Sequence, residues 1–206
     1  MNTVANEPAV VHLVDDDDSL RKALSRVLNA AGHEVRTYAS AADFLLERDS
    51  APRGCLVLDV RMPGGPSGLE LQRALARQGA SMPVIFLTGH GDIPMSVQAI
   101  KDGAHDFLTK PVERAALLAA VSSAMASAEA EEGRHLRKRE VMRRIGRLTP
   151  SERKVFVEVV RGLANKQIAA DLGCSERTVK AHRAQVMTKM EATSLADLVH
   201  QADLMG

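Results

Sequence analysis

The stretch Cys55-Leu56-Val57-Leu58-Asp59-Val60 decides the fold class, because its apolar side chains run on without polar alternation until a single acid. Strands that are buried on both faces of a parallel sheet have this pattern. Val84-Ile85-Phe86-Leu87 repeats it, so both runs are expected to be central strands. An acid at the end of a buried strand is not explained by packing, and it directs attention to the carboxyl edge of the sheet.

Strands and helices alternate around these two runs over the first 125 residues. Short apolar runs predict strands over residues 10–14, 34–38, 55–60, 83–88 and 105–109. Helical spacing of apolar residues predicts helices near residues 20–28, 42–48, 68–78, 94–102 and 112–126. This alternation predicts a doubly wound α/β domain, with a five-stranded parallel sheet and its ligand at the carboxyl ends of the strands.

From Leu148 onward the pattern is helical throughout. Thr149-Pro150-Ser151-Glu152 combines a capping residue, an early proline and an acid, which is typical of a helix start. Helices are predicted near residues 150–161, 165–172, 175–190 and 194–204, and the short link Gly173-Cys174 is typical of a helix-turn-helix. We therefore divide the chain into an α/β domain over 8–126, a helical linker over 127–145 and a small all-α domain over 146–206.

Composition excludes several function classes. The formal net charge is +1, but it is −3 over residues 1–125 and +2 over each of 126–145 and 146–206, so the rear of the chain is basic. Aromatic residues make up 2%, which argues against binding by stacked rings. Cys55 and Cys174 lack metal-ligand spacing and are expected to be reduced structural thiols. The start lacks a signal-peptide pattern and there is no apolar run of about 18 residues, so we expect a cytoplasmic protein without a membrane partner.

Acids gather where the predicted strands end. Asp15-Asp16-Asp17-Asp18 follows the first strand and Asp59 ends the third, which predicts an oxygen-liganded site for a hard cation such as Mg²⁺ with a phosphate. The aspartate run by itself is equally well explained as a helix N-terminus, where acids suit the macrodipole. Asp59 has no such explanation and shifts the balance towards a metal site.

Four motifs at predicted strand ends carry a resemblance. Val14-Asp-Asp, Leu58-Asp59-Val-Arg-Met-Pro-Gly, Leu87-Thr88-Gly-His and Thr109-Lys110-Pro111 together resemble the receiver domain of bacterial two-component response regulators. The rear resembles the LuxR/FixJ-type helix-turn-helix through Leu148-Thr-Pro-Ser-Glu-Arg, Gly162-Leu-Ala-Asn-Lys-Gln-Ile-Ala and Thr178-Val-Lys-Ala-His-Arg. The two resemblances cover nearly the whole chain, and their combination is similar to the FixJ-like branch.

The resemblance to receivers implies a role for each acid. Asp59 would be the phosphoacceptor, which takes a phosphoryl group from a histidine of a sensor histidine kinase. Asp15 and Asp16 would hold Mg²⁺ together with a carboxylate oxygen of Asp59 and the backbone carbonyl of Arg61. Asp17 is left as the second choice, because it can cap the following helix instead.

The same resemblance assigns three further residues. Lys110 would supply a second fixed cation, Thr88 would donate its hydroxyl to a phosphoryl oxygen, and Phe107 would be the switch aromatic that turns inward when Thr88 moves. The Lys110–Pro111 bond is similar to the family's cis peptide. One departure stands out: Met62-Pro-Gly-Gly-Pro-Ser-Gly68 has one residue more than the usual family pattern, which puts the loop beside the acceptor in doubt.

In the rear domain, Ser175–Met190 has a net charge of +3. A solvated helix face explains that charge equally well, but the position after a short turn favours insertion into a major groove of double-stranded DNA. Lys180 and Arg183 are the strongest predicted DNA contacts, with Thr178 and Lys166 expected at phosphates. Ala181 and Ala184 suggest readout by methyl contacts or by few residues.

Two other classes compete with this interpretation. A hydrolase of the haloacid dehalogenase type also uses a strand-end aspartate, but it needs a second acid two residues later, where this chain has Arg61. An RNA-binding antiterminator would also have a receiver in front, but the basic third helix of the rear domain speaks against it. We therefore expect a regulator and not an enzyme. This regulator is expected to form a homodimer on phosphorylation and to bind promoter DNA, and RNA polymerase is a further candidate partner.

Overall fold

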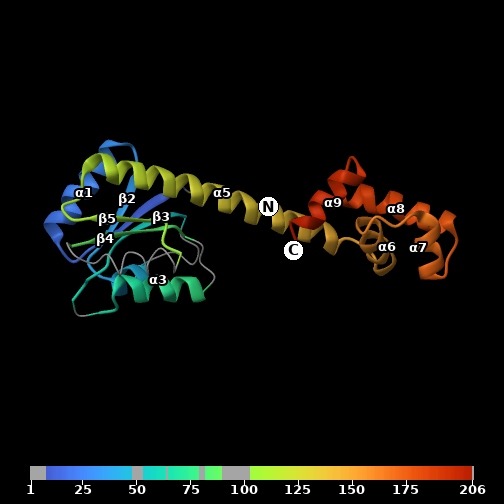
Figure 1. Cartoon of the computed structure of the whole chain (residues 1–206), viewed down its shortest axis with the longest axis horizontal. Helices are drawn as coiled ribbons and strands as arrows, with labels where there is room; N and C mark the ends of the chain where they lie inside the picture. Colours follow the sequence, from blue (N-terminus) through green and yellow to red (C-terminus); the bar gives the residue numbers. More distant parts are fainter. Residues whose placement is uncertain (1–7, 48–52, 64, 79–81, 90–102, 206) are drawn as a thin grey trace. The chain divides into compact units, whose positions relative to one another are not determined.

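The computed structural model describes residues 8–47, 53–63, 65–78, 82–89 and 103–205. The chain divides into two compact units, Met1–Glu131 and Glu132–Gly206. The first unit contains the sheet and the second is helical (Figure 1). None of the helices within the described ranges is long and apolar enough to cross a membrane.

The first unit is built on a five-stranded parallel sheet in the order β2-β1-β3-β4-β5. Its strands are β1 (Val10–Val14), β2 (Glu34–Tyr38), β3 (Gly54–Asp59), β4 (Val84–Thr88) and β5 (Asp106–Thr109). The predicted sheet is confirmed, with every strand end within one residue of its expected place. The helix predicted over 94–102 lies outside the described residues.

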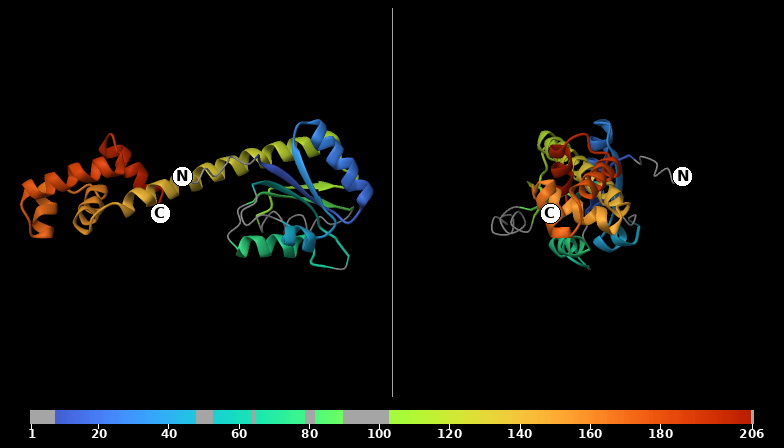
Figure 2. Two further views of the ribbon diagram at one scale, coloured as in Figure 1. Left: turned by 180° about the vertical axis from the view of Figure 1, so that it is seen from behind. Right: turned by 90° about the vertical axis from the view of Figure 1, so that its right-hand side faces the viewer.

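Helices cover both faces of the sheet, as Figures 1 and 2 show. On one face α1 (Asp18–Ala30) and the first part of α5 (Arg114–Gly146) pack on the sheet, and on the other face lie α2 (Ala41–Glu47) and α3 (Gly68–Arg77). Every residue of β1, β3 and β4 is buried. The continuous apolar runs are explained by this double coverage.

The second unit is a bundle of short helices: α6 (Pro150–Val160), α7 (Asn165–Leu172), α8 (Glu176–Met190) and α9 (Leu195–Asp203). Thr149 and Glu152 form the predicted cap of α6, with the Glu152 amide donating to Thr149 Oγ1 at 3.3 Å and the Thr149 amide donating to Glu152 Oε2 at 2.7 Å. Gly173 ends α7 in the left-handed conformation with φ 64°, which glycine adopts at low cost. The helix-turn-helix prediction is therefore confirmed.

The predicted linker, 127–145, lies within α5, which begins before it and ends just after it. Leu117, Val121 and Ala124 at the start of α5 are buried in the first unit. Val141 and Ile145 near its end are buried in the core of the second unit. One helix thus contributes side chains to both cores.

We predict that the native protein exposes one reactive thiol. Cys55 is fully buried in β3, and burial raises its pKa to about 12, so about one molecule in ten thousand carries the reactive thiolate at pH 8. Cys174 is only partly buried. A thiol titration with a chromogenic disulfide at pH 8 should count one fast group in the native chain and two after denaturation. The Cys174→Ser variant should have no fast group, and fast labelling of Cys55 in the folded chain would contradict this burial.

Candidate functional site

Two buried carboxylates meet at the carboxyl edge of the sheet. Asp15 follows the last residue of β1, and Asp59 is the last residue of β3, the strand that pairs with β1 in parallel. Asp15 is fully buried and Asp59 is 6% exposed. Two buried carboxylates repel each other, so the arrangement requires a cation.

Lys110 supplies that cation from the end of β5. Its Nζ lies 2.7 Å from Asp15 Oδ2 and 2.7 Å from Asp59 Oδ2. Burial raises the pKa of Asp15, and the hydrogen bond from Lys110 only partly offsets that effect. Burial is the largest single influence on Lys110 and disfavours its charge, but its hydrogen bonds and charge attraction to Asp15 and Asp59 together outweigh burial and raise its pKa. The lysine is therefore a fixed positive charge between the two acids.

Backbone amides hold the other oxygen of each carboxylate. The Asp17 amide donates to Asp15 Oδ1 at 2.9 Å, and the Arg61 amide donates to Asp59 Oδ1 at 3.0 Å. In each carboxylate, one oxygen thus accepts a hydrogen bond from Lys110 and the other accepts one from a backbone amide. This arrangement fixes the orientation of both groups, which a site for a small ion needs.

Asp15, Asp16 and Asp59 form one acidic cluster. One carboxylate oxygen of each lies within 4.8 Å of the others, and Asp16 is the exposed member. Oxygen donors at this spacing fit a hard cation, so the cluster can bind a metal ion. Asp17 does not join it, because its side chain accepts from the amides of Ser19 and Leu20 and caps α1.

Thr88 and Phe107 lie on the neighbouring strands. Thr88 ends β4 and is buried; its carbonyl accepts from the Lys110 amide at 2.6 Å, and its hydroxyl donates to the Gly89 carbonyl at 3.2 Å. Phe107 on β5 is half-buried and pairs in register with Phe86, with ring centroids 6.4 Å apart. The Lys110–Pro111 peptide bond is cis, as the resemblance implied.

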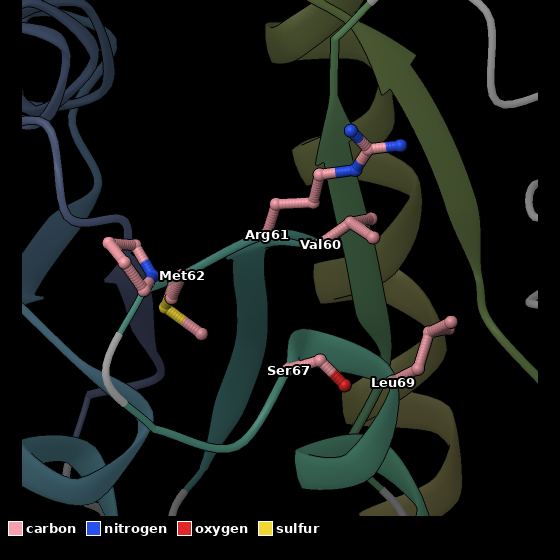
Figure 3. A pocket seen from close by; sticks show the side chains of 6 residues that line it. Val60, Arg61, Met62, Ser67 and Leu69 are labelled. Carbon is pink, nitrogen blue, oxygen red and sulfur yellow. The ribbon is translucent and has the colours of Figure 1, made fainter.

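The loop with the extra residue returns close to the acceptor. The Gly68 amide donates to the Val60 carbonyl at 3.1 Å, and a Cβ on Gly68 would lie 2.4 Å from the Asp59 carbonyl, so this position requires glycine. Beside the loop is a hollow of about 470 Å³, where Arg61 and Met62 point in different directions (Figure 3). Its described lining comprises Val60, Arg61, Met62, Pro63, Ser67 and Leu69.

Sequence reasoning missed Arg21 in this site. Its Nη1 donates to the Asp15 carbonyl at 2.6 Å and its Nη2 pairs with Asp18 Oδ1 at 3.0 Å. The guanidinium therefore braces the backbone of the most buried acid. The available signal was a basic residue about one turn into a helix that starts with an acid.

Three of the four residues predicted to contact DNA are exposed, and the fourth is half-buried. Lys180 and Thr178 are exposed on the N-terminal half of α8, and Lys166 is exposed at the start of α7. Arg183 is half-buried, and its Nη1 donates to Asn165 Oδ1 at 3.0 Å. The structure thus places Arg183 between α8 and the first residue of α7.

Arg177 is a candidate that the sequence analysis did not select. It is exposed, and helical spacing places it on the same face as Lys180, Ala181 and Ala184. Its spacing of three residues from Lys180 was the available signal. The exposed face of α8 therefore carries two basic side chains around two alanines.

A parallel α/β domain with a lysine-bridged acidic edge, followed by a helix-turn-helix unit, defines a transcriptional response regulator. Residues 11–122 match the family described as "Response regulator receiver domain", and residues 146–202 match "Bacterial regulatory proteins, luxR family". The chain belongs to the two-component response regulators that carry a luxR-family DNA-binding domain. The family consists of regulators rather than classical enzymes, which sets aside the hydrolase alternative. The luxR-type DNA-binding domain sets aside the RNA-binding alternative.

Named relatives cover almost the entire chain. Transcriptional regulatory protein FixJ of Azorhizobium caulinodans is 51% identical over 97% of this chain and 94% of its own length, and Nodulation protein W of Bradyrhizobium diazoefficiens is 43% identical over 100% and 90%. Among solved structures, the response regulator StyR is 43% identical with a TM-score of 0.83, covering 95% of this chain and 98% of its own. Full-length FixJ from B. japonicum is 39% identical with a TM-score of 0.59, covering 96% and 97%.

Replacing Lys110 should destabilise the first unit, because two buried carboxylates lose their cation. We expect Lys110→Ala to lower the free energy of unfolding by about 1–3 kcal/mol in metal-free buffer. Lys22→Ala is the control, since the Lys22–Asp18 pair at 2.7 Å is well exposed and should change stability by less than about 0.5 kcal/mol. Urea titration followed by circular dichroism measures both. Equal effects of the two substitutions would show that the bridge contributes little.

Proposed function

We propose that this protein is activated by phosphorylation of Asp59 and then binds promoter DNA as a homodimer. The observation that carries the proposal is the convergence of Asp15, Asp59 and Lys110 at one edge of the sheet, at 2.7 Å contacts. The receiver family implies a sensor histidine kinase as the phosphoryl donor, and the luxR-family domain implies DNA binding. In this proposal the α/β domain, residues 8–126, receives the phosphoryl group, and the all-α domain, residues 146–206, binds DNA. The helical linker, residues 127–145, connects these two domains, and the protein acts in the cytoplasm.

Asp59 suits the role of nucleophile. A carboxylate oxygen of Asp59 would attack the phosphorus as the bond between phosphorus and the kinase imidazole nitrogen breaks, which leaves an acyl phosphate on Asp59 and the imidazole on the kinase. The ammonium group of Lys110 contacts Asp59 Oδ2, so it is close enough to form an ion pair with an oxygen of a phosphoryl group bound to Asp59. The buried Thr88 is proposed to donate its hydroxyl to another phosphoryl oxygen.

The acidic cluster fits Mg²⁺, with Asp15, Asp16, Asp59 and the backbone carbonyl of Arg61 as the proposed ligands. A bound Mg²⁺ would offset the charge that develops on the phosphoryl oxygens. Asp15 is kept in orientation by Lys110 and the Asp17 amide, and Arg21 holds its carbonyl. Hydrolysis of the acyl phosphate by water at the same site would end the signal.

Phosphate incorporation tests the acceptor. Incubation with acetyl phosphate and Mg²⁺ should add one phosphoryl group to the wild-type chain, measured as a mass shift of the intact protein, and none to Asp59→Asn. Chelation of Mg²⁺ should stop the reaction, because the cluster would repel the incoming anion. Sedimentation should show the phosphorylated wild type as a dimer and Asp59→Asn as a monomer after the same treatment. Equal incorporation by the variant would exclude Asp59 as the sole acceptor.

For the second unit, we propose that α8 enters the major groove with Lys180 and Arg183 at base edges and with Thr178 and Lys166 at phosphates. The exposed basic residues on the N-terminal half of α8 support this orientation. Each chain has one such helix, whereas two half-sites lie about 34 Å apart or a multiple of that, which supports a dimer. Phe107 is proposed to turn inward with Thr88 and so favour pairing of receivers. RNA polymerase is the proposed partner of the DNA-bound dimer.

Two substitutions separate base reading from phosphate contact. Arg183→Ala should weaken binding to a selected duplex by about 1–3 kcal/mol, whereas Lys166→Ala should weaken all duplexes alike and lower the salt slope by about one. Fluorescence anisotropy over a series of salt concentrations measures both. Asn165→Ala is the control for Arg183, because it removes the 3.0 Å contact between them but keeps the guanidinium. Unchanged affinity in both Arg183→Ala and Lys166→Ala would place the DNA-binding surface elsewhere.

A further inference from the structure

The last turns of α5 form part of the core that supports α8. Val141 is 4% exposed and Ile145 is 9% exposed, and both belong to the apolar cluster that contains the fully buried Met190 at the end of α8. The end of the recognition helix and the end of the connecting helix therefore contribute to the same core.

Arg144 adds a polar contact at the same place. Its Nη1 donates to the Met190 carbonyl at 3.0 Å, its Nη2 pairs with Glu191 Oε2 at 2.9 Å, and its Nε donates to Glu140 Oε1 at 2.9 Å. The side chain is 20% exposed. Carbonyls at the end of a helix lack partners within the helix, and a cation there is favourable because it complements the helix dipole.

The residue that Arg144 holds also ends α8. Glu191 is the C-cap of α8, in the left-handed conformation with φ 54°, which is uncommon for a residue other than glycine. Arg147 lies 3.6 Å from the same carboxylate, and Lys189 of α8 pairs with the buried Glu152 of α6 at 2.6 Å. The C-terminal end of α8 is thus attached to both α5 and α6.

From these contacts we propose that Arg144 is a positioning residue for the recognition helix. Its planar guanidinium binds the end of α8 in two places while Glu140 holds it on α5, and this geometry fixes the direction of α8. Lys180 lies ten residues from Met190, or roughly 15 Å along a helix, so Arg144 acts without touching DNA. A tilt of about 10° at the attached end would move Lys180 by roughly 2–3 Å, which is enough to break a hydrogen bond to a base. The proposal rests on the assignment of α8 as the DNA-reading helix.

Arg143 provides a matched control. It lies on the same turn of α5 and donates to both carboxylate oxygens of Glu140, at 2.8 and 2.7 Å, but its side chain is 60% exposed. Arg143→Ala and Arg144→Ala remove the same charge from adjacent positions. Only Arg144→Ala removes the hydrogen bond to the Met190 carbonyl and the pair with Glu191.

The test uses the full chain after the same acetyl phosphate treatment of every variant. Affinity is measured for a duplex that the wild type selects from random-sequence DNA and for a scrambled duplex of the same composition, well below the unfolding temperature of each variant. Arg144→Ala should bind the selected duplex about tenfold more weakly and the scrambled duplex less than twofold more weakly, and Arg144→Lys should recover part of the loss. Arg143→Ala should change both affinities less than twofold.

Three results would overturn the proposal. One is an equal effect of Arg143→Ala and Arg144→Ala, and another is a lower unfolding temperature of Arg144→Ala with unchanged affinity for the selected duplex. The third comes from Lys180→Ala and Arg183→Ala in the same series: if neither weakens binding, α8 does not read DNA and the proposed function fails as well. If these two weaken binding and Arg144→Ala does not, only the positioning role fails. Should Arg144→Ala fail to fold, Glu191→Gln removes the ion pairs of Glu191 with Arg144 and Arg147 but keeps the hydrogen bond from Arg144 to the Met190 carbonyl. It should weaken selected binding by about threefold, and Arg147→Ala, which removes only the longer pair, should have a smaller effect.

Discussion

The bridge from Lys110 to Asp15 and Asp59 is the interaction on which the first unit depends. Three strands deliver these side chains, and each contact is 2.7 Å long, so β1, β3 and β5 must end at the same edge for the bridge to form. A buried carboxylate is unfavourable by itself, and a pair of them more so. Lys110 compensates the charges of Asp15 and Asp59 in the folded state. The exposed Asp16 lies beside them, and the three carboxylates can bind a cation.

The connecting helix α5 contributes to the core of each unit. The start of α5 buries Leu117, Val121 and Ala124 in the core of the first unit, and its end buries Val141 and Ile145 in the core of the second unit. A packed side chain cannot shift without moving its neighbours, so the position of each end of α5 is fixed by the core in which it is packed.

The sequence predicted the sheet well, for a physical reason. Strands such as β3 and β4 are buried on both faces, and full burial requires an apolar residue at every position, which is visible in the chain itself. The starts of α6 and α8 were also readable, because their caps are local contacts between residues three positions apart. The boundary of the connecting helix was less readable, since the apolar seam of α5 fades before Val141 resumes it in another core.

What the sequence determined by itself is therefore local or periodic: the order of strands and helices, the acids at the strand ends, the basic α8 and the family motifs. Tertiary structure brought Asp15 and Asp16 together with Asp59, which ends another strand, while Asp17 caps α1. It also decided that Arg21 donates a hydrogen bond to the Asp15 carbonyl and that Arg144 donates one to the Met190 carbonyl at the end of α8. Arg144 and Met190 are far apart in the chain, and contacts of this kind leave no periodic pattern in a sequence, since they depend on how helices pack rather than on where they begin and end.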